Sequence, residues 1–362
     1  MCSLEHMSFQ PQNPSPAGRG SVSNPPNRFA KLTVELESEA LVDDDGEPLR
    51  PRTQFLHDDS QSVITFNDSP DIPFRAGLNP YRGCEHGCAY CFARPYHEYL
   101  GFSAGLDFET KIVVKENAPE LLRRELSKKS WQPVPISMSA ISDCYQPVER
   151  RLQLTRRCLA VLAEFRQPVG IITKNHLVTR DIDHLAELAR HHAAHVCISL
   201  TTLDAALAKT LEPRASPPTR RLAAIAELSA AGIPVIVLTA PIIPGLTDHE
   251  IPDLLAAAAR AGARTAGYTI VRLPWAVAPI FTAWLERHAP GHRDKVLSRI
   301  ESMRGGKLYD SRWGVRMKGE GIFAEQIRAL FALAKRKAGF PGEVPDLSTA
   351  AFRVPTDQLS LF

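Results

Sequence analysis

Three cysteines, Cys84, Cys88 and Cys91, stand close together in a loop that also contains Gly83 and Gly87. Their spacing is Cys-x-x-x-Cys-x-aromatic-Cys. Three thiolates in such a loop can wrap one 4Fe–4S cubane and ligate three of its irons. The fourth iron then receives no ligand from this loop, and an open metal position is what catalysis at a metal requires. The spacing therefore predicts a catalytic cluster.

A structural zinc site is the competing interpretation of the same cysteines. Such a site needs four ligands, and His86 or His97 could supply one of them. The spacing matches no common zinc finger, and no second cysteine pair follows in the chain. The motif favours the iron–sulfur cluster.

The loop resembles that of the radical S-adenosylmethionine (SAM) superfamily, which places this pattern at the end of the first strand of a barrel. The resemblance implies SAM bound to the open iron, with cleavage to methionine and a 5′-deoxyadenosyl radical. It also implies an electron donor such as flavodoxin or ferredoxin. The protein would supply orientation, electrostatics and exclusion of water.

Residues 79–273 resemble, more narrowly, spore photoproduct lyase and its DNA repair photolyase-like relatives. Beyond the cysteine loop, the match rests on short blocks in and after the following strands, which are Ser139-Ala140-Ile141-Ser142-Asp143, Thr173-Lys174, Ile198-Ser199, Leu211-Glu212-Pro213-Arg214-Ala215-Ser216-Pro217 and Ala240-Pro241-Ile242.

The branch also implies which residues contact SAM. Ser142, Lys174 and Ser199 match positions that hold its polar groups, and Tyr90 would pack near the adenine. An ammonium at a strand end can pair with the methionine carboxylate. A salt bridge from Lys174 to a nearby acid is the alternative, and for each serine the alternative is a local backbone partner.

Two departures separate the chain from spore photoproduct lyase itself. Ala140 stands where that enzyme has its hydrogen-donating cysteine, and Phe92 stands where it has a tyrosine. Neither side chain donates hydrogen to a radical. Cys144 is a candidate substitute donor, although a lone cysteine is more often structural.

The segments that must position these residues alternate between short apolar runs and helical periodicity. A first strand is expected just before Cys84, and five more strands are expected at residues 134–138, 169–173, 196–200, 235–239 and 268–271. Intervening helical patterns predict a parallel sheet. We therefore expect an α/β fold, a partial TIM-like (β/α)6 barrel with active residues at the carboxyl ends of its strands.

The composition divides the chain into four parts. Residues 1–70 are rich in Pro, Ser and Asp, which predicts an extended or disordered arm. Residues 71–290 form the expected core, 291–340 a helical extension, and 341–362 a flexible tail. The net charge of +3 is too small to indicate nucleic acid by itself. No run spans a membrane and no signal peptide pattern is present, so we expect a cytoplasmic protein.

The last residues, Gln358, Leu359, Ser360, Leu361 and Phe362, resemble the peptide by which bacterial repair proteins dock on the sliding clamp. A glutamine suits a polar pocket, and the two terminal apolar side chains suit a groove. The alternative is that they fold back on the domain. Clamp docking agrees with the repair-like branch.

The sequence thus predicts a radical SAM enzyme that acts on nucleic acid, on a DNA lesion or base, with lyase-like chemistry. A radical SAM enzyme acting on a peptide or small molecule is one alternative. A non-catalytic metal-binding interaction module is the other. Arg272 could meet an anionic substrate or form a structural ion pair, and Asp181 and Asp183 could line the site or start a helix.

Overall fold

A computed structural model describes residues 18–30, 52–344 and 346–355. Its main sheet has the strand order β10-β9-β8-β7-β6-β3-β2. Strand β2 (Ile64–Phe66) runs antiparallel to its neighbour at one edge. The other strands are mutually parallel, namely β3 (Ala76–Leu78), β6 (Ile136–Met138), β7 (Val169–Thr173), β8 (Ala194–Ser199), β9 (Val235–Ile242) and β10 (Thr265–Ile270).

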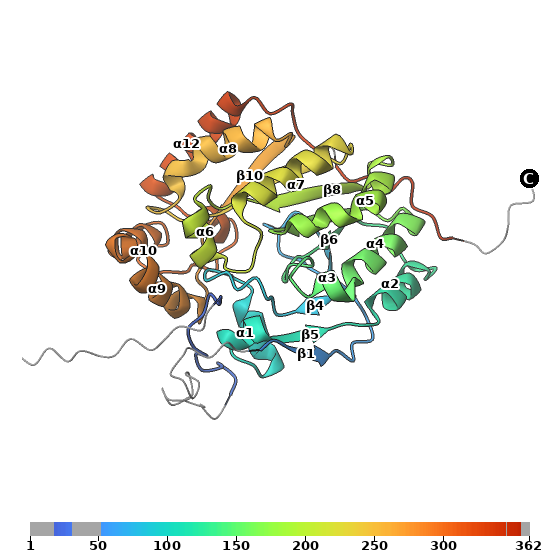
Figure 1. Ribbon diagram of the computed structural model, residues 1–362, viewed down its shortest axis with the longest axis horizontal. Coiled ribbons are helices and arrows are strands. Elements are labelled where there is room, and N and C mark those ends of the chain that lie inside the picture. The colour runs from blue at the N-terminus through green and yellow to red at the C-terminus, as the bar shows by residue number, and fades with distance from the viewer. Residues whose placement is uncertain (1–17, 31–51, 345, 356–362) are drawn as a thin grey trace, which may run out of the picture.

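The order of these parallel strands in space is their order along the chain, so each crossover returns the chain beside the strand it left. Helices form the crossovers and lie along the outside of the strands (Figure 1). They are α2 (Ala118–Leu126), α4 (Leu154–Phe165), α5 (Ile182–Ala189), α7 (Pro218–Ala230) and α8 (Ile251–Arg260). No ladder joins β10 to β2 among the described residues. The predicted partial (β/α)6 barrel is therefore confirmed.

The main core lies between these helices and the sheet. Each helix turns one apolar face inward; Leu162 and Phe165 of α4 and Leu188 of α5 are buried against strand residues such as Val196. Burying each such side chain contributes about 1.5–3 kcal/mol relative to exposure. This packing fixes the strand ends at which the predicted site residues stand.

A second, smaller sheet carries the start of the cysteine loop. It has the order β1-β5-β4, from β1 (Gln54–His57), β5 (Lys111–Val114) and β4 (Tyr81–Arg82). The 3-10 helix η2 (Arg94–Leu100) and helix α1 (Leu106–Thr110) follow the cysteines and precede β5. Sequence periodicity had not indicated these short elements.

The described parts of residues 1–70 differ from the predicted extended arm. Strands β1 and β2 lie in it, and residues 18–30 pack on the domain. The reason is hydrogen bonding to a residue distant in the sequence rather than apolar burial: the backbone N–H groups of Gly20 and Ser21 donate to the buried carboxylate of Glu109, at 3.0 and 2.9 Å.

The helical segment between β6 and β7 consists of two helices rather than one. The short α3 (Glu149–Leu152) ends at Gln153, whose φ of +52° is left-handed, and α4 begins at the next residue. A left-handed residue breaks the i to i−4 ladder, which side-chain periodicity alone does not reveal.

Four α-helices follow β10 in the described part of the chain. They are α9 (Val277–His288), α10 (Arg293–Ser302), α11 (Val315–Lys318) and α12 (Ile322–Ala338), and α12 packs on α8. Helix α6 (Ala205–Leu211) follows β8. The clamp-like residues Gln358, Leu359, Ser360, Leu361 and Phe362 lie outside the described residues. Among the described residues no helix is long and apolar enough to cross a membrane.

Candidate active site at the carboxyl ends of the strands

The cysteine loop begins directly after β3 and bends at two glycines. Gly83 has φ of +81° and Gly87 has φ of +67°, a region that glycine adopts at little steric cost. The N–H of Cys84 donates to Phe108 O at 2.9 Å, and the N–H of Ala89 donates to Leu211 O at 3.0 Å. The loop is thus held from both sides, by α1 and by the end of α6.

A buried ion pair supports the loop from below. The guanidinium of Arg94 donates to Glu109 Oε1 at 2.5 Å and to the carbonyls of Gly87 and Cys88 at 3.2 and 3.0 Å. A Cβ on residue 20 would lie 1.6 Å from the carbonyl oxygen of Gly87, so the N-terminal segment approaches the loop at a distance that only glycine permits.

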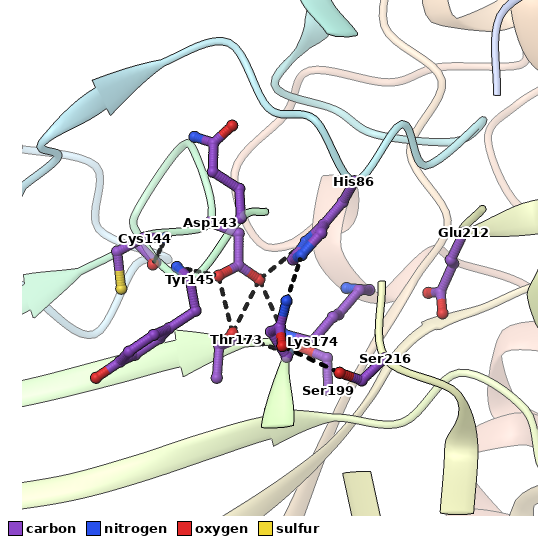
Figure 2. A network of polar contacts seen from close by, with 12 residues as sticks. His86, Asp143, Cys144, Tyr145, Thr173, Lys174, Ser199, Glu212 and Ser216 are labelled. Atoms are coloured by element: carbon purple, nitrogen blue, oxygen red, sulfur yellow. Dashed lines mark hydrogen bonds and ion pairs between the residues drawn. The ribbon is translucent and has the colours of Figure 1, made fainter. Parts of the chain in front are cut away.

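Asp143, after β6, links the ends of β6 and β7 to the loop (Figure 2). Its carboxylate accepts from Thr173 Oγ1 at 2.8 Å, from Lys174 N at 2.8 Å and from Tyr145 N at 2.9 Å. His86 Nδ1 lies 3.3 Å from it. Burial opposes ionisation, but His86 and these donors outweigh it and lower the pKa of Asp143. We call this group the Asp143 hub.

The hydrogen bonds around Asn175 orient its side-chain amide toward His86. Asn175 Oδ1 accepts from Leu177 N and from Ser216 Oγ, so Nδ2 is the atom that faces His86 Nε2 at 3.2 Å. An amide nitrogen only donates, which makes Nε2 the acceptor and places the ring proton on Nδ1, toward Asp143.

Glu212, after α6, forms a second buried centre. Its carboxylate accepts from the hydroxyls of Tyr90 and Thr201 and pairs with Arg221 of α7. Arg221 also donates to Ser199 O at 3.1 Å. Burial opposes ionisation of Glu212, but Arg221 and then Lys174 outweigh it and lower its pKa to about 2. We call this group the Glu212 hub.

The structure brings three of the four residues predicted to contact SAM together. Tyr90 joins the Glu212 hub through its hydroxyl and Ser199 through its backbone carbonyl, and Lys174 Nζ lies 5.8 Å from the centroid of the Tyr90 ring. The ammonium of Lys174 makes no ion pair with any described carboxylate; Asp143 binds its backbone N–H instead. Ser142 lies apart, lining a cavity of about 250 Å³, and its buried Oγ has no hydrogen-bond partner among the described residues.

The three cysteines of the loop are free thiols, as ligation of a cluster requires. Cys84 and Cys88 are buried free thiols whose pKa values are raised, chiefly by burial. Iron ligation supplies the positive charge that stabilises thiolates in such surroundings. Both nitrogens of His86 already have partners, so it is no free zinc ligand.

The other residues singled out from the sequence are buried in the core or already have side-chain partners. Cys144 is fully buried in the main core, and burial raises the pKa of its thiol. Asp181 accepts from Arg156, Arg180 and the hydroxyl of Tyr145, while Asp183 pairs with Arg156, which lowers its pKa to about 2. Arg272 faces the ring of Phe92, with Cζ 4.2 Å from the centroid.

Sequence reasoning missed the polar groups that hold the site together. Glu212 stood in a quoted block without a role, and Arg221, Arg94 and Glu109 were not singled out. The sequence did contain a signal for Arg221, because it is a charged residue on the otherwise apolar face of a helix, between Pro218 and Ile225. Such a residue is buried only if it is paired.

The chain is similar to members of one known superfamily and to two uncharacterized proteins. Residues 78–258 match the family model of the radical SAM superfamily. The uncharacterized protein Rv2578c of Mycobacterium tuberculosis is 39% identical over 221 residues, which cover 60% of this chain and 65% of that protein. The uncharacterized protein MJ0683 of Methanocaldococcus jannaschii is 32% identical over 173 residues, covering 48% and 62%. The match thus spans less than two thirds of these relatives.

Among solved structures, the fold is similar to that of spore photoproduct lyase complexed with dinucleoside spore photoproduct. The TM-score is 0.58 at 14% sequence identity, and 80% of each chain is covered. A mutant of that enzyme with bound AdoMet and dinucleoside spore photoproduct gives a TM-score of 0.55 at 15% identity. The family model covers half of this chain and includes all three cysteines, so the chain belongs to the radical SAM superfamily, and its cofactors are a 4Fe–4S cluster and SAM.

Proposed function

We propose that this chain is a radical SAM enzyme that acts on nucleic acid, repairing or modifying a DNA base by lyase-like chemistry. The binding of SAM is supported chiefly by the position of Lys174. Its ammonium stands at the end of β7, beside Tyr90, and makes no ion pair with a described carboxylate. A cation left free at a strand end, next to buried thiols, is suited to a carboxylate ligand.

The residues have distinct tasks in this proposal. Cys84, Cys88 and Cys91 hold the cluster; when bound and reduced, the cluster with SAM supplies a 5′-deoxyadenosyl radical. Lys174 binds the methionine carboxylate, and Ser199 provides a further polar contact. The Glu212 hub holds the Tyr90 ring in place, and the burial of Cys84 and Cys88 excludes water.

Nucleic acid as the substrate is supported by the fold shared with spore photoproduct lyase, whose solved complex contains a dinucleoside lesion. The reaction should differ in its last steps. Ala140 and Phe92 cannot donate hydrogen, and Cys144 is buried in the core. A base inside a duplex would have to leave the stack to reach the site.

The first experiment is anaerobic reconstitution with iron and sulfide, reduction, addition of SAM, and chromatographic detection of 5′-deoxyadenosine. We expect a cluster spectrum and cleavage, both abolished in Cys88→Ala. Lys174→Met should keep the cluster and raise the apparent Kd for SAM by roughly 10- to 150-fold, the effect of losing one charged hydrogen bond. Lys209→Met, on the exposed face of α6, is the matched control. A bound zinc, or an intact cluster without cleavage, would contradict the proposal.

Two partners belong to the proposal. An electron donor such as flavodoxin or ferredoxin would reduce the cluster. The residues Gln358, Leu359, Ser360, Leu361 and Phe362 would dock on the sliding clamp, which surface plasmon resonance can test with immobilised clamp. We expect Phe362→Ala to abolish the signal and Thr356→Ala, just before the motif, to leave it unchanged.

A further inference from the structure

A row of exposed rings lies on the surface beside the cysteine loop. Tyr96, Tyr99, Phe29 and Trp275 are each between 50% and 68% exposed. The ring centroids of Tyr96 and Tyr99 are 6.4 Å apart, and those of Tyr99 and Phe29 are 4.9 Å apart. The guanidinium of Arg28 contacts both the Phe29 ring and the Trp275 ring, with Cζ 5.0 Å from the first centroid and 4.1 Å from the second. We call these five residues the aromatic row.

Three separate segments build the aromatic row. Two of its members come from the N-terminal segment, two from η2 directly after the cysteines, and Trp275 from the loop after β10. Trp275 has φ of +45°, a left-handed conformation that bulky residues rarely adopt. Core packing does not explain this backbone, because the indole is more than half exposed. Strained backbone of this kind concentrates at binding sites.

Positive charge without a described counter-ion borders the row. Arg272, in the same loop as Trp275, stacks on Phe92 and makes no ion pair or hydrogen bond among the described residues. Beneath it, Arg304 is 2% exposed. Its Nη2 donates to Val271 O at 2.8 Å, while Nε and Nη1 have no partner in the described part of the chain. Burial and then the charge of Arg272 lower the pKa of Arg304.

The carboxylates in this neighbourhood are already engaged. Asp71 pairs with Arg316, and Asp310 pairs with Arg312. Neither is paired with Arg272 or Arg304. The surface therefore presents rings together with a surplus of positive charge, which is what an anionic ligand with flat apolar parts requires.

A cavity opens beside the row. Tyr96 and Tyr99 line the cavity of about 250 Å³ that also contains Ser142 and His97. Two of its polar atoms, Ser142 Oγ and His97 Nε2, are buried and have no hydrogen-bond partner among the described residues. Burial lowers the pKa of His97 to about 4, so its ring is neutral at physiological pH. Unpartnered neutral groups in a buried wall suit the edge of a nucleobase.

We propose that the aromatic row and Arg272 bind a single-stranded or locally unpaired nucleic-acid strand, whose bases stack on the rings and whose phosphates lie at Arg272, and that one base enters the cavity beside Tyr96 and Tyr99. The polymer that alternates flat rings with negative charges is the ligand that this surface matches. This inference rests on the proposed function and names its substrate and the residues that bind it.

Fluorescence anisotropy of the anaerobically reconstituted full chain tests the proposal. The probe is a fluorescein-labelled single strand of about 15 nucleotides, compared with the same sequence as a duplex. We expect the single strand to bind more tightly, and Trp275→Ala and Tyr99→Ala each to weaken its binding by roughly 5- to 150-fold, the effect of one lost stacking contact. Trp275→Phe should restore most of the affinity.

Two controls separate this surface from general effects. Phe66→Ala removes a ring that is 71% exposed on β2, the sheet edge opposite β10, and should change nothing. Arg272→Gln should reduce the slope of log affinity against log salt by about 0.7, the value for one phosphate contact to a single strand. Arg157→Gln, on α4, should leave that slope unchanged.

The outcomes distinguish this inference from the proposed chemistry when 5′-deoxyadenosine formation is measured on the same preparations. Cleavage of SAM without binding of the strand would overturn the surface and leave the radical chemistry standing. Equal weakening by Trp275→Ala and Phe66→Ala, or tighter binding of the duplex, would also overturn it. Binding that depends on Trp275 in a preparation that does not cleave SAM would support the surface and refute the chemistry.

Discussion

The Asp143 hub and the Glu212 hub each place a carboxylate against the cysteine loop, half-buried in Asp143 and buried in Glu212, yet they balance its charge differently. Asp143 receives two backbone N–H groups, the hydroxyl of Thr173 and Nδ1 of His86. Glu212 receives two hydroxyls and a full positive charge from Arg221. In the Asp143 hub, hydrogen-bond donors surround the carboxylate. In the Glu212 hub, the carboxylate forms an ion pair with Arg221, whose side chain is 1% exposed.

This difference assigns the two hubs different tasks. The donors around Asp143 come from strand ends β6 and β7 and from the loop, so that hub fixes their relative positions. The Glu212 hub joins the loop, through Tyr90, to α7 and to the end of β8. Its net charge is near zero, which leaves Lys174 as the cation available for a ligand. Removing the carboxylate should therefore cost more in the Glu212 hub, where an unpaired buried charge is left behind.

The largest expected effect comes from Glu212→Gln. The substitution leaves Arg221 buried without its counter-ion, and breaking a buried pair in this way costs roughly 3–5 kcal/mol of unfolding free energy. Urea unfolding of the metal-free chain, followed by circular dichroism, measures it. Glu120→Gln is the matched control, because its partner Arg157 is exposed and such pairs contribute about 0–1 kcal/mol.

A double variant sharpens this prediction. In Glu212→Gln with Arg221→Met, both charges are gone and the unpaired guanidinium no longer opposes folding. We expect the double variant to be more stable than Glu212→Gln alone. A loss equal to the sum of the two single losses would mean that the pair is not coupled, and the contrast between the hubs would fail.

Asp143→Asn should have the next largest effect. The new amide nitrogen faces donors, namely Lys174 N–H, Thr173 Oγ1 or His86 Nδ1–H, and leaves at least one unsatisfied. One buried unsatisfied group costs about 1–3 kcal/mol. The same unfolding assay applies, with Asp183→Asn on the exposed side of Arg156 as control. A loss larger than that of Glu212→Gln would reverse the comparison.

The pH dependence of stability should follow the Glu212 carboxylate. Its pKa is about 2 in the folded chain against 4.5 ordinarily, so its contribution is present above pH 4.5 and is lost as pH falls toward 2. The difference in unfolding free energy between the natural chain and Glu212→Gln should stay constant near neutrality. Between pH 4.5 and 3 it should shrink by roughly 1.5 kcal/mol. If this difference in unfolding free energy increased at acid pH, the lowered pKa of Glu212 would be contradicted.

Much of the fold could be predicted from the sequence because periodicity reports burial. The strand predicted at residues 169–173 is β7 to the residue, and the expected position of the cysteines after the first barrel strand is confirmed by β3. Both predictions rest on local patterns, namely an apolar run of strand length and a spacing of ligands. The strand-end residues Lys174 and Ser199 were named from the resemblance to the spore photoproduct lyase branch, and they do stand at the ends of β7 and β8.

The polar supports could not be predicted, because their partners are distant in the sequence. Gly20 and Glu109 meet across 89 positions, and Glu85 N bonds Gln146 across 61. Neither periodicity nor composition reports which carboxylate a backbone N–H will find. The same limit explains why residues 18–30, which are poor in apolar side chains, were predicted to be extended and are instead held on the domain.

The smallest expected effect on stability comes from a substitution of Cys144, which lies outside both hubs. Its backbone bonds Ser139 Oγ and Thr155 Oγ1, and its thiol lies in the main core on the side of Asp143 away from Glu212 (Figure 2). Cys144→Ala should cost about 1 kcal/mol, the effect of one buried heavy atom. Cys158→Ala, in the same core, is the matched control.

SAM cleavage should be equal in both variants, since neither thiol reaches the ligand side of the hubs. If Cys144→Ala alone accumulates an organic radical by electron paramagnetic resonance in the presence of DNA, while its stability matches that of Cys158→Ala, then Cys144 is the hydrogen donor despite its burial.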